Sequence, residues 1–127
     1  MAHRSRIAAF VLDCQVDDLG PATAFWSQAL GQAVANADED GDGRYAELQA
    51  VPGHPHMLLQ RVGHHSHIHL DIETDDLDAE VARLEALGAR RVAFVKRWWV
   101  MEAPTGQRFC VVRMKHPERG APPREWP

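Results

Sequence analysis

The chain has few of the features that point to disulfides, membranes or nucleic acids. Its 127 residues include only two cysteines, Cys14 and Cys110, and no C-x-x-C pair, so we expect reduced thiols in a cytoplasmic protein. No apolar run approaches the ~20 residues that span a bilayer. The formal net charge of −4 leaves no basic excess. We therefore expect neither a nucleic-acid partner nor a membrane partner.

Several catalytic signatures are also absent. The sequence has no G-x-S-x-G, Walker loop, G-x-G-x-x-G or H-E-x-x-H motif. A basic N-terminal stretch precedes a short apolar run, but no small-residue cleavage pattern follows, so we do not expect a signal peptide. The composition, 45% hydrophobic and 25% charged, is that of an ordinary globular protein. The length suits one domain with a sizeable core.

The chain contains an internal repeat. Residues 11–19 (VLDCQVDDL) and 69–77 (HLDIETDDL) share the pattern L-D-x-x-x-D-D-L, and Ala-Leu-Gly recurs at 29–31 and 86–88. In each copy a run of strand length precedes two aspartates, whose carboxylates suit a helix N-cap. Gly31 and Gly88 stand where a left-handed C-cap ends a helix. Each copy therefore predicts a strand, a capped helix and a glycine stop.

Three shorter strand candidates follow each helix. With the leading strands, the sequence predicts an α+β fold of two βαβββ modules, at about residues 6–62 and 66–114, in a single domain spanning 1–114. Residues 115–127 hold four prolines and are expected to form a flexible extension or an arm over a neighbour. The strands are expected at 7–14, 32–35, 44–49, 56–61, 66–72, 91–95, 98–101 and 108–113.

This pattern resembles the vicinal oxygen chelate superfamily, which includes glyoxalase I, bleomycin-resistance proteins and extradiol dioxygenases. The stretches DDLDAEVARLEALGARRV and RWWVMEAPTGQRFCVV are similar to the small glyoxalase-like domain proteins of that group. The resemblance covers residues 6 to about 114. It implies that the two modules form a U-shaped cleft with a mixed sheet, that a small molecule binds in the cleft, and that the protein is a homodimer.

The resemblance also implies where a metal ion would bind. Metal-using members place four ligands on the cleft faces of strands, two from each module. His69 occupies one such position, but its repeat counterpart is Val11, which cannot bind a metal. The last-strand position, usually glutamate, is Cys110, and only Gln60 could serve in the other strand of the first module. We therefore expect no metal cofactor of the usual kind, with a divalent metal at His69 as the alternative.

Histidines cluster at the start of the second module. Strand alternation places His67, His69 and Asp71 on one face, which the resemblance directs to the cleft. Ile68 and Leu70 lie on the other face and are expected in the core. His67 and His69, about 6–7 Å apart on a strand, could hold one ion together with a third ligand. The alternative is that these histidines and the preceding His64 and His65 are solvated, or that one bonds an acid such as Asp71.

Asp13 and Asp71 are repeat equivalents and are candidate catalytic residues. Two carboxylates in a cleft could act as acid and base, although a shared structural role in both modules is the alternative. Trp98 and Trp99 are adjacent on one strand, so one should enter the core while the other forms an aromatic wall of the pocket. The sequence does not say which.

Two further side chains are candidates for ligand contact. Arg108 shares a strand face with Cys110 and could meet an anionic ligand or simply face solvent. Cys110 could be a nucleophile if a base such as His69 lowered its pKa. A different motif, Asp38 to Gly43, fits the opening of a calcium loop, D-x-D-x-D-G, but Gln49 stands where the loop needs glutamate, so we interpret it as an acidic hairpin turn.

These observations favour a cytoplasmic protein of the glyoxalase and bleomycin-resistance type. We expect it to bind a small organic molecule without the usual metal site, with His67, His69, Trp98, Trp99, Arg108 and Cys110 as candidate binding residues. The alternative is a metal-dependent lyase, isomerase or dioxygenase of the same superfamily. A third interpretation is an interaction module that uses the C-terminal tail.

Overall fold

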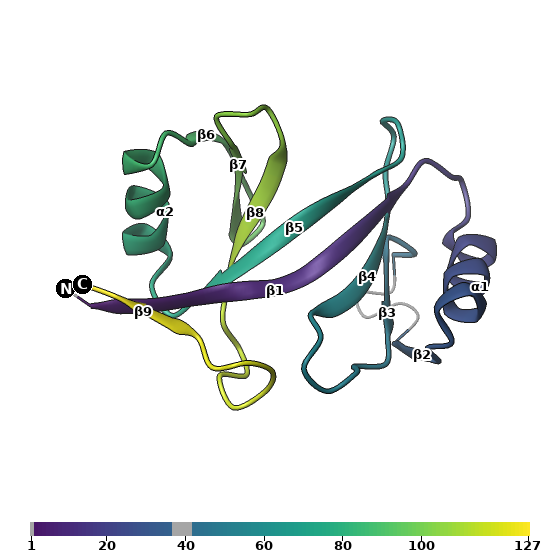
Figure 1. Cartoon of the computed structure of the whole chain (residues 1–127). Helices are drawn as coiled ribbons and strands as arrows, with labels where there is room; N and C mark the ends of the chain where they lie inside the picture. Colours follow the sequence, from purple (N-terminus) through teal and green to yellow (C-terminus); the bar gives the residue numbers. More distant parts are fainter. Residues whose placement is uncertain (1, 37–41) are drawn as a thin grey trace. The chain divides into compact units, whose positions relative to one another are not determined.

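The computed structural model describes residues 2–36 and 42–127. The chain divides into two compact units, the first formed by Ala9–Ile68 and the second by Met1–Ala8 together with His69–Pro127. Each unit has one helix and a β-sheet, which confirms the predicted α+β fold of two βαβββ modules (Figure 1). Most of the stretch that we interpret as an acidic hairpin turn, at residues 38–41, lies outside the described residues.

The first unit builds its sheet in the order β2-β3-β4-β1. These strands are β1 (His3–Cys14), β2 (Val34–Asn36), β3 (Tyr45–Leu48) and β4 (His56–Arg61). β1 runs parallel to β4, whereas β3 is antiparallel to both of its neighbours. The helix α1 (Leu19–Leu30) packs against β3 and β4 (Figure 1). The buried core of the first unit consists of Leu12, Cys14, Leu19, Ala46, Leu48 and Leu59.

The caps of α1 agree with the sequence prediction. The Asp18 side chain accepts a hydrogen bond from the Gly20 amide at 3.0 Å, which satisfies one of the amides left open at the helix start. At the other end, Gly31 has φ of 67°, and its amide bonds the carbonyl of Gln28. Only glycine takes this left-handed conformation without steric cost.

The second unit repeats this plan with β5 (His67–Thr74), β6 (Arg90–Val95), β7 (Trp98–Glu102) and β8 (Arg108–Arg113). Its strand order is β5-β8-β7-β6, with β5 parallel to β8 and the other pairs antiparallel. The helix α2 (Leu77–Ala86) packs on β8 and β6. The buried core of the second unit consists of Leu77, Val81, Met101 and Val111.

The α2 caps differ slightly from those of α1. The Asp76 side chain accepts a hydrogen bond from the Ala79 amide at 3.1 Å, as the acidic pair predicted. At the C-terminal end, Leu87 occupies the cap position in a right-handed conformation. Gly88 follows with φ of 110°, so the predicted glycine still supplies the left-handed turn, one residue beyond the cap.

The prediction that Ile68 and Leu70 belong to the core is wrong. Ile68 is 60% exposed and Leu70 is 40% exposed. The reason is the register of the sheet: β5 pairs with β8 only from Leu70 onward, and α2 covers β8 and β6. The first residues of β5 therefore extend beyond the part of the second unit that its helix shields.

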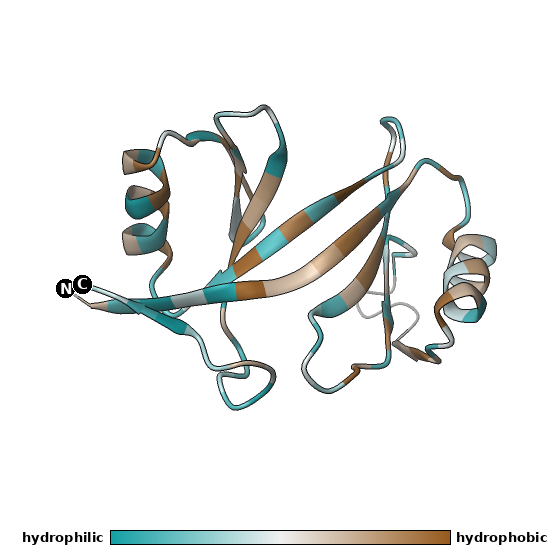
Figure 2. Ribbon diagram, in the orientation of Figure 1, coloured by the Kyte–Doolittle hydropathy of each residue, from teal (hydrophilic) through white to brown (hydrophobic). Residues whose placement is uncertain are grey.

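The C-terminal segment differs from the flexible extension that the sequence suggested. Residues Arg124–Trp126 form a further strand, β9, antiparallel to His3–Ser5 of β1. Figure 2 shows that this strand is mainly hydrophilic, so little apolar burial holds it in place. Polar contacts anchor it instead: the Trp126 indole donates to Ser5 Oγ at 2.8 Å and its ring lies under the Arg83 guanidinium.

Among the described residues, no helix has the length and apolar character that a membrane crossing requires.

Candidate functional site

The strand register of the second unit separates the two adjacent tryptophans. Trp99 pairs with Val111 and packs against the core under α2, with the Phe94 ring edge-on at 5.1 Å. Because side chains alternate along a strand, Trp98 lies on the opposite face, which it shares with Cys110. Trp99 is therefore the tryptophan that enters the core.

Three of the predicted site residues come together on this same face of the second unit. Asp71 and Cys110 are register partners of the parallel pair β5 and β8. His69 Nε2 lies 3.4 Å from Asp71 Oδ1, and each side chain is largely buried. Ligand atoms of His69, Asp71 and Cys110 all lie within 4.8 Å of one another. An imidazole, a carboxylate and a thiol together offer the donor types that zinc accepts.

Arg108 does not join this group. Its guanidinium Nε lies 3.1 Å from Glu102 Oε1, while Arg90 contacts the other carboxylate oxygen at 2.9 Å. The hydrogen bonds from Arg90 and Arg108 lower the pKa of Glu102. Arg108 is thus part of a surface ion-pair network across β6, β7 and β8, and this pairing accounts for its position without an anionic ligand.

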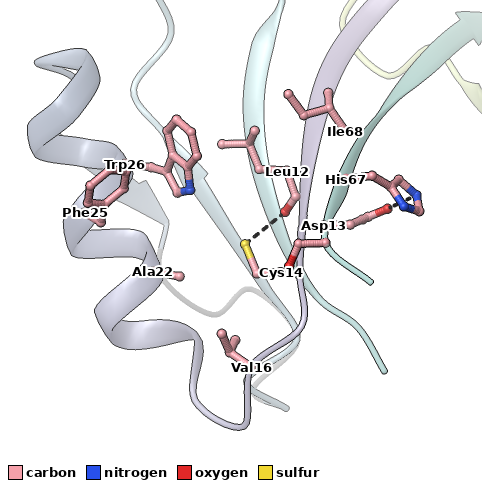
Figure 3. A pocket seen from close by; sticks show the side chains of 10 residues that line it. Leu12, Asp13, Cys14, Val16, Ala22, Phe25, Trp26, His67 and Ile68 are labelled. Carbon is pink, nitrogen blue, oxygen red and sulfur yellow. Dashed lines mark hydrogen bonds and ion pairs between the residues drawn. The ribbon is translucent and has the colours of Figure 1, made fainter. Parts of the chain in front are cut away.

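In the first unit, Asp13 and His67 form a second polar pair. His67 Nε2 lies 3.2 Å from Asp13 Oδ2 (Figure 3). Asp13 is only 3% exposed, whereas half of the His67 side chain is accessible. A carboxylate is costly to bury without a compensating partner, and His67 supplies one. His67 therefore contacts Asp13, whereas His69 contacts Asp71, so the two histidines on one strand serve different carboxylates.

These two residues lie at the margin of a pocket in the first unit. The pocket has a volume of about 420 Å³ and is bounded by α1, the end of β1 and the start of β5. Figure 3 shows the Trp26 ring on the helix side of the space, across from Leu12, with the Phe25 ring beyond Trp26. The lining is mostly apolar, with Asp13, Ser66 and His67 as its polar members. The complete set is Leu12, Asp13, Cys14, Val16, Ala22, Phe25, Trp26, Ser66, His67 and Ile68.

The Cys14 thiol faces this pocket. Its sulfur donates to the Leu12 carbonyl at 3.3 Å. Burial raises the pKa of the thiol, and the neighbouring Asp13 carboxylate raises it further. Because the thiolate is the nucleophilic form, Cys14 is a poor nucleophile at neutral pH. Its role here is that of an apolar wall.

The sequence prediction missed part of this pocket. Trp26 packs against the core of the first unit and also forms the pocket wall beside the exposed Phe25. The apolar side chains of α1 were the available signal, because Leu19, Ala22, Phe25, Trp26 and Ala29 cover more of the helix than one sheet face can bury. The sequence prediction also did not include His64 among the site residues. Its ring stacks on His67 with centroids 4.7 Å apart.

The sequence model of the glyoxalase-like domain matches residues 9–112, which is most of the chain. The chain belongs to the glyoxalase-like domain family. This confirms the resemblance to the vicinal oxygen chelate superfamily. A search of curated protein sequences found no match.

Solved structures of the same superfamily share the fold of this glyoxalase-like protein. A methylmalonyl-CoA epimerase variant of Streptomyces coelicolor, in complex with 2-nitronate-propionyl-CoA, is 17% identical with a TM-score of 0.63, over 87% of this chain and 97% of that one. The epimerase of Mycobacterium tuberculosis is 21% identical with a TM-score of 0.59, over 91% and 88%. A glyoxalase/bleomycin resistance protein/dioxygenase superfamily member from Vibrio splendidus is 16% identical with a TM-score of 0.58, over 87% and 99%. At these identities the likeness establishes the fold alone.

The four-ligand metal site of the superfamily does not fit the residues present here. Val11 is buried and apolar at one position. Gln60 donates from its amide to the Tyr45 hydroxyl at 3.3 Å. Cys110 replaces the carboxylate that the resemblance implies, and His69 is the one residue that matches. The glyoxalase-like fold is therefore present without the usual set of metal ligands.

Proposed function

We propose that this glyoxalase-like protein binds a small organic molecule in the pocket of its first unit, without using the metal site of the superfamily. The observation that carries the proposal is the pocket itself. Its volume of about 420 Å³ falls in the range of small-molecule sites, which are typically apolar cavities with a few converging polar groups. The rings of Phe25 and Trp26 would contact the apolar body of the ligand.

The polar margin of the pocket suggests the chemistry of the ligand. The Asp13 carboxyl group can accept hydrogen bonds, and His67 beside it can donate or accept. A ligand with a flat or branched apolar body and one hydroxyl or amino group would satisfy both parts. The group would compete with His67 for the Asp13 carboxylate, so binding and the Asp13–His67 contact are coupled.

A fragment screen followed by nuclear magnetic resonance tests this proposal. Small aromatic and aliphatic fragments are added to isotopically labelled protein, and we expect those that bind to shift the Trp26 indole signal and the amides around Asp13 and His67. Ala22→Phe should fill the pocket from α1 and weaken binding at least about tenfold, since the lost contacts exceed ~1.4 kcal/mol. Ala24→Phe, on an exposed position of the same helix, is the matched control.

The proposal fails if Ala22→Phe and the wild type bind the fragments equally. It also fails if fragments shift only signals from residues 69–127.

A second candidate function is a metal-dependent lyase, isomerase or dioxygenase. One observation favours it: the converging donors of His69, Asp71 and Cys110. Protein purified without a polyhistidine tag would then contain about one metal ion per chain, and both the Cys110→Ser and the His69→Asn variants would contain less. Metal content that does not change in these two variants would remove this candidate.

A further inference from the structure

A second group of metal-binding side chains lies outside the positions that the superfamily uses. Asp13 from β1, His67 from the start of β5 and His64 from the preceding loop offer three ligand atoms within 4.8 Å of one another. All three belong to the first unit. None of the superfamily positions (Val11, Gln60, His69 and Cys110) is a member of this group.

The separation of Asp13 and His67 suits a shared ion. Zinc binds histidine nitrogen at about 2.0–2.1 Å and carboxylate oxygen at about 2.0–2.2 Å. Two such ligands at a roughly tetrahedral angle lie about 3.2–3.5 Å apart. The observed distance from His67 Nε2 to Asp13 Oδ2 is 3.2 Å. The two atoms are thus at the spacing of two ligands of one ion, which would replace the direct contact between them.

The hydrogen bond of His64 prepares its ring for coordination. His64 Nδ1 lies 2.8 Å from the His65 carbonyl oxygen, which can only accept, so Nδ1 carries the proton. In the neutral ring this leaves the lone pair on Nε2. Metal-binding histidines commonly donate their other ring nitrogen to a carbonyl in this way, which fixes the tautomer and the ring orientation. His64 is therefore set in a ligand tautomer.

Hydrogen bonds from Gln15 hold the histidine loop beside β1. The Gln15 amide donates to Ser66 Oγ at 2.9 Å, and its side-chain nitrogen donates to the Gly63 carbonyl at 3.1 Å. The amide of Val62 also bonds the Cys14 carbonyl at 2.9 Å. These contacts hold the loop backbone on both sides of His64 beside Asp13. The His64 and His67 rings are stacked with planes 12° apart, so the His64 ring would turn about its side-chain bonds when both rings bind one ion.

We propose that Asp13, His64 and His67 bind one divalent transition-metal ion, of the zinc, cobalt or nickel class. Two imidazoles and one carboxylate match the ligand preference of these ions. Asp13 supplies a buried oxygen ligand, and the exposed imidazoles give the ion access from solvent. The remaining coordination positions would accept water or a polar group. This metal site does not depend on the proposed organic ligand, so metal binding can be tested without that ligand.

Zinc titration of the untagged full chain, followed by calorimetry, tests the site. We expect one zinc ion per chain in the wild type, and a loss of affinity of at least about tenfold in both His64→Asn and His67→Asn. His65→Asn is the matched control, since this neighbouring exposed histidine belongs to neither group. His64 is exposed too, so His64→Asn should fold normally, which thermal unfolding without metal will verify.

Cobalt substitution separates this site from the thiol-containing group in the second unit. A cobalt ion bound by nitrogen and oxygen alone should lack the thiolate-to-cobalt charge-transfer band in the near ultraviolet, and Cys110→Ser should bind zinc as the wild type does. The proposal is overturned if the wild type binds no zinc, if His64→Asn and His67→Asn bind it unchanged, or if His65→Asn weakens binding equally. A thiolate band lost in Cys110→Ser would assign the ion to the other group and overturn it as well.

Discussion

His3 and Glu80 form a buried pair that links the first strand to the second helix. His3 Nε2 lies 2.8 Å from Glu80 Oε1, and both side chains are almost fully shielded from solvent. Arg83 completes the network, with Nε and Nη2 at 2.8 and 2.9 Å from the two carboxylate oxygens. This pair ties residues at the start of β1 into the second unit, although 77 positions separate them.

Replacing Glu80 should destabilise the fold. Glu80→Ala leaves a buried histidine without its partner and Arg83 without its acceptor, which costs roughly 1–3 kcal/mol for each buried polar group left unsatisfied. The measurement is the free energy of unfolding in urea. Glu85→Ala is the control on the same helix, because its exposed ion pair with Arg91 should contribute less than about 1 kcal/mol. Equal losses in the two variants would contradict the structural role of Glu80.

The same network predicts an acid-dependent loss of stability. Burial acts to raise the pKa of Glu80, but hydrogen bonds from Arg83, His3 and Ser5 outweigh it and hold the pKa below its ordinary value. The unfolded chain therefore takes up the proton first, near the ordinary glutamate value of about 4.3. The stabilisation by Glu80 is complete above that pH and is lost as the pH falls through the lowered value. The unfolding free energies of wild type and Glu80→Gln should converge over this range, whereas a constant difference down to the acid limit would refute the assignment.

The C-terminal strand should contribute to stability. Deleting residues 115–127 removes the carbonyl groups of His116 and Ala121 that accept from Arg6 at 3.0 and 2.6 Å. Arg6 is only 9% exposed, so we expect a loss of roughly 2–3 kcal/mol, visible as a lower Tm. Trp126→Ala should reproduce part of this loss by removing the contacts with Ser5 and Arg83. Glu125 is exposed on the same strand, so Glu125→Ala should leave the Tm unchanged. An unchanged Tm after the deletion would show that β9 does not contribute to stability.

Core and surface leucines should respond differently to truncation. Leu59 is completely buried in the first unit, so Leu59→Ala should cost about 2–5 kcal/mol through lost burial and the cavity left behind. Leu87, at the C-terminal cap of α2, is 67% exposed, and Leu87→Ala should stay within about 0.5 kcal/mol of wild type. Chemical denaturation of the two variants measures both. A large loss at Leu87 would mean that another surface covers it in solution.

The two thiols should differ in reactivity. Burial and Asp13 raise the pKa of Cys14, so its thiolate is scarce at neutral pH. We expect iodoacetamide to modify Cys110, which is partly exposed, several times faster than Cys14, as followed by peptide mass spectrometry. Denaturant should remove the difference. Faster modification of Cys14 in the folded protein would show that the pocket activates its thiol.

Much of the architecture could be read from the repeated pattern. The acidic pairs predicted both helix starts, because Asp18 and Asp76 can satisfy open amides using contacts only two or three residues away. Gly31 predicted a helix end for the same local reason, since its left-handed backbone needs no distant partner. Strand alternation likewise placed Asp71 and His69 together on one face.

The departures come from contacts between distant segments. Ile68 looked like a core residue because it is apolar, but whether a strand position is buried depends on where the helix lies and where pairing begins. Residues 115–127 looked flexible because they are proline-rich and polar, yet β9 forms because Arg6, Ser5 and Arg83 provide partners more than 40 residues away.

The sequence by itself determined the two βαβββ modules and their helix caps, because each depends on local spacing or on residue identity. Only the tertiary structure decided that Trp99 is the core tryptophan, that His67 pairs with Asp13 while His69 pairs with Asp71, and that His64 joins the first pair. Strand register and the course of a loop produce these contacts, and neither follows from the local pattern alone.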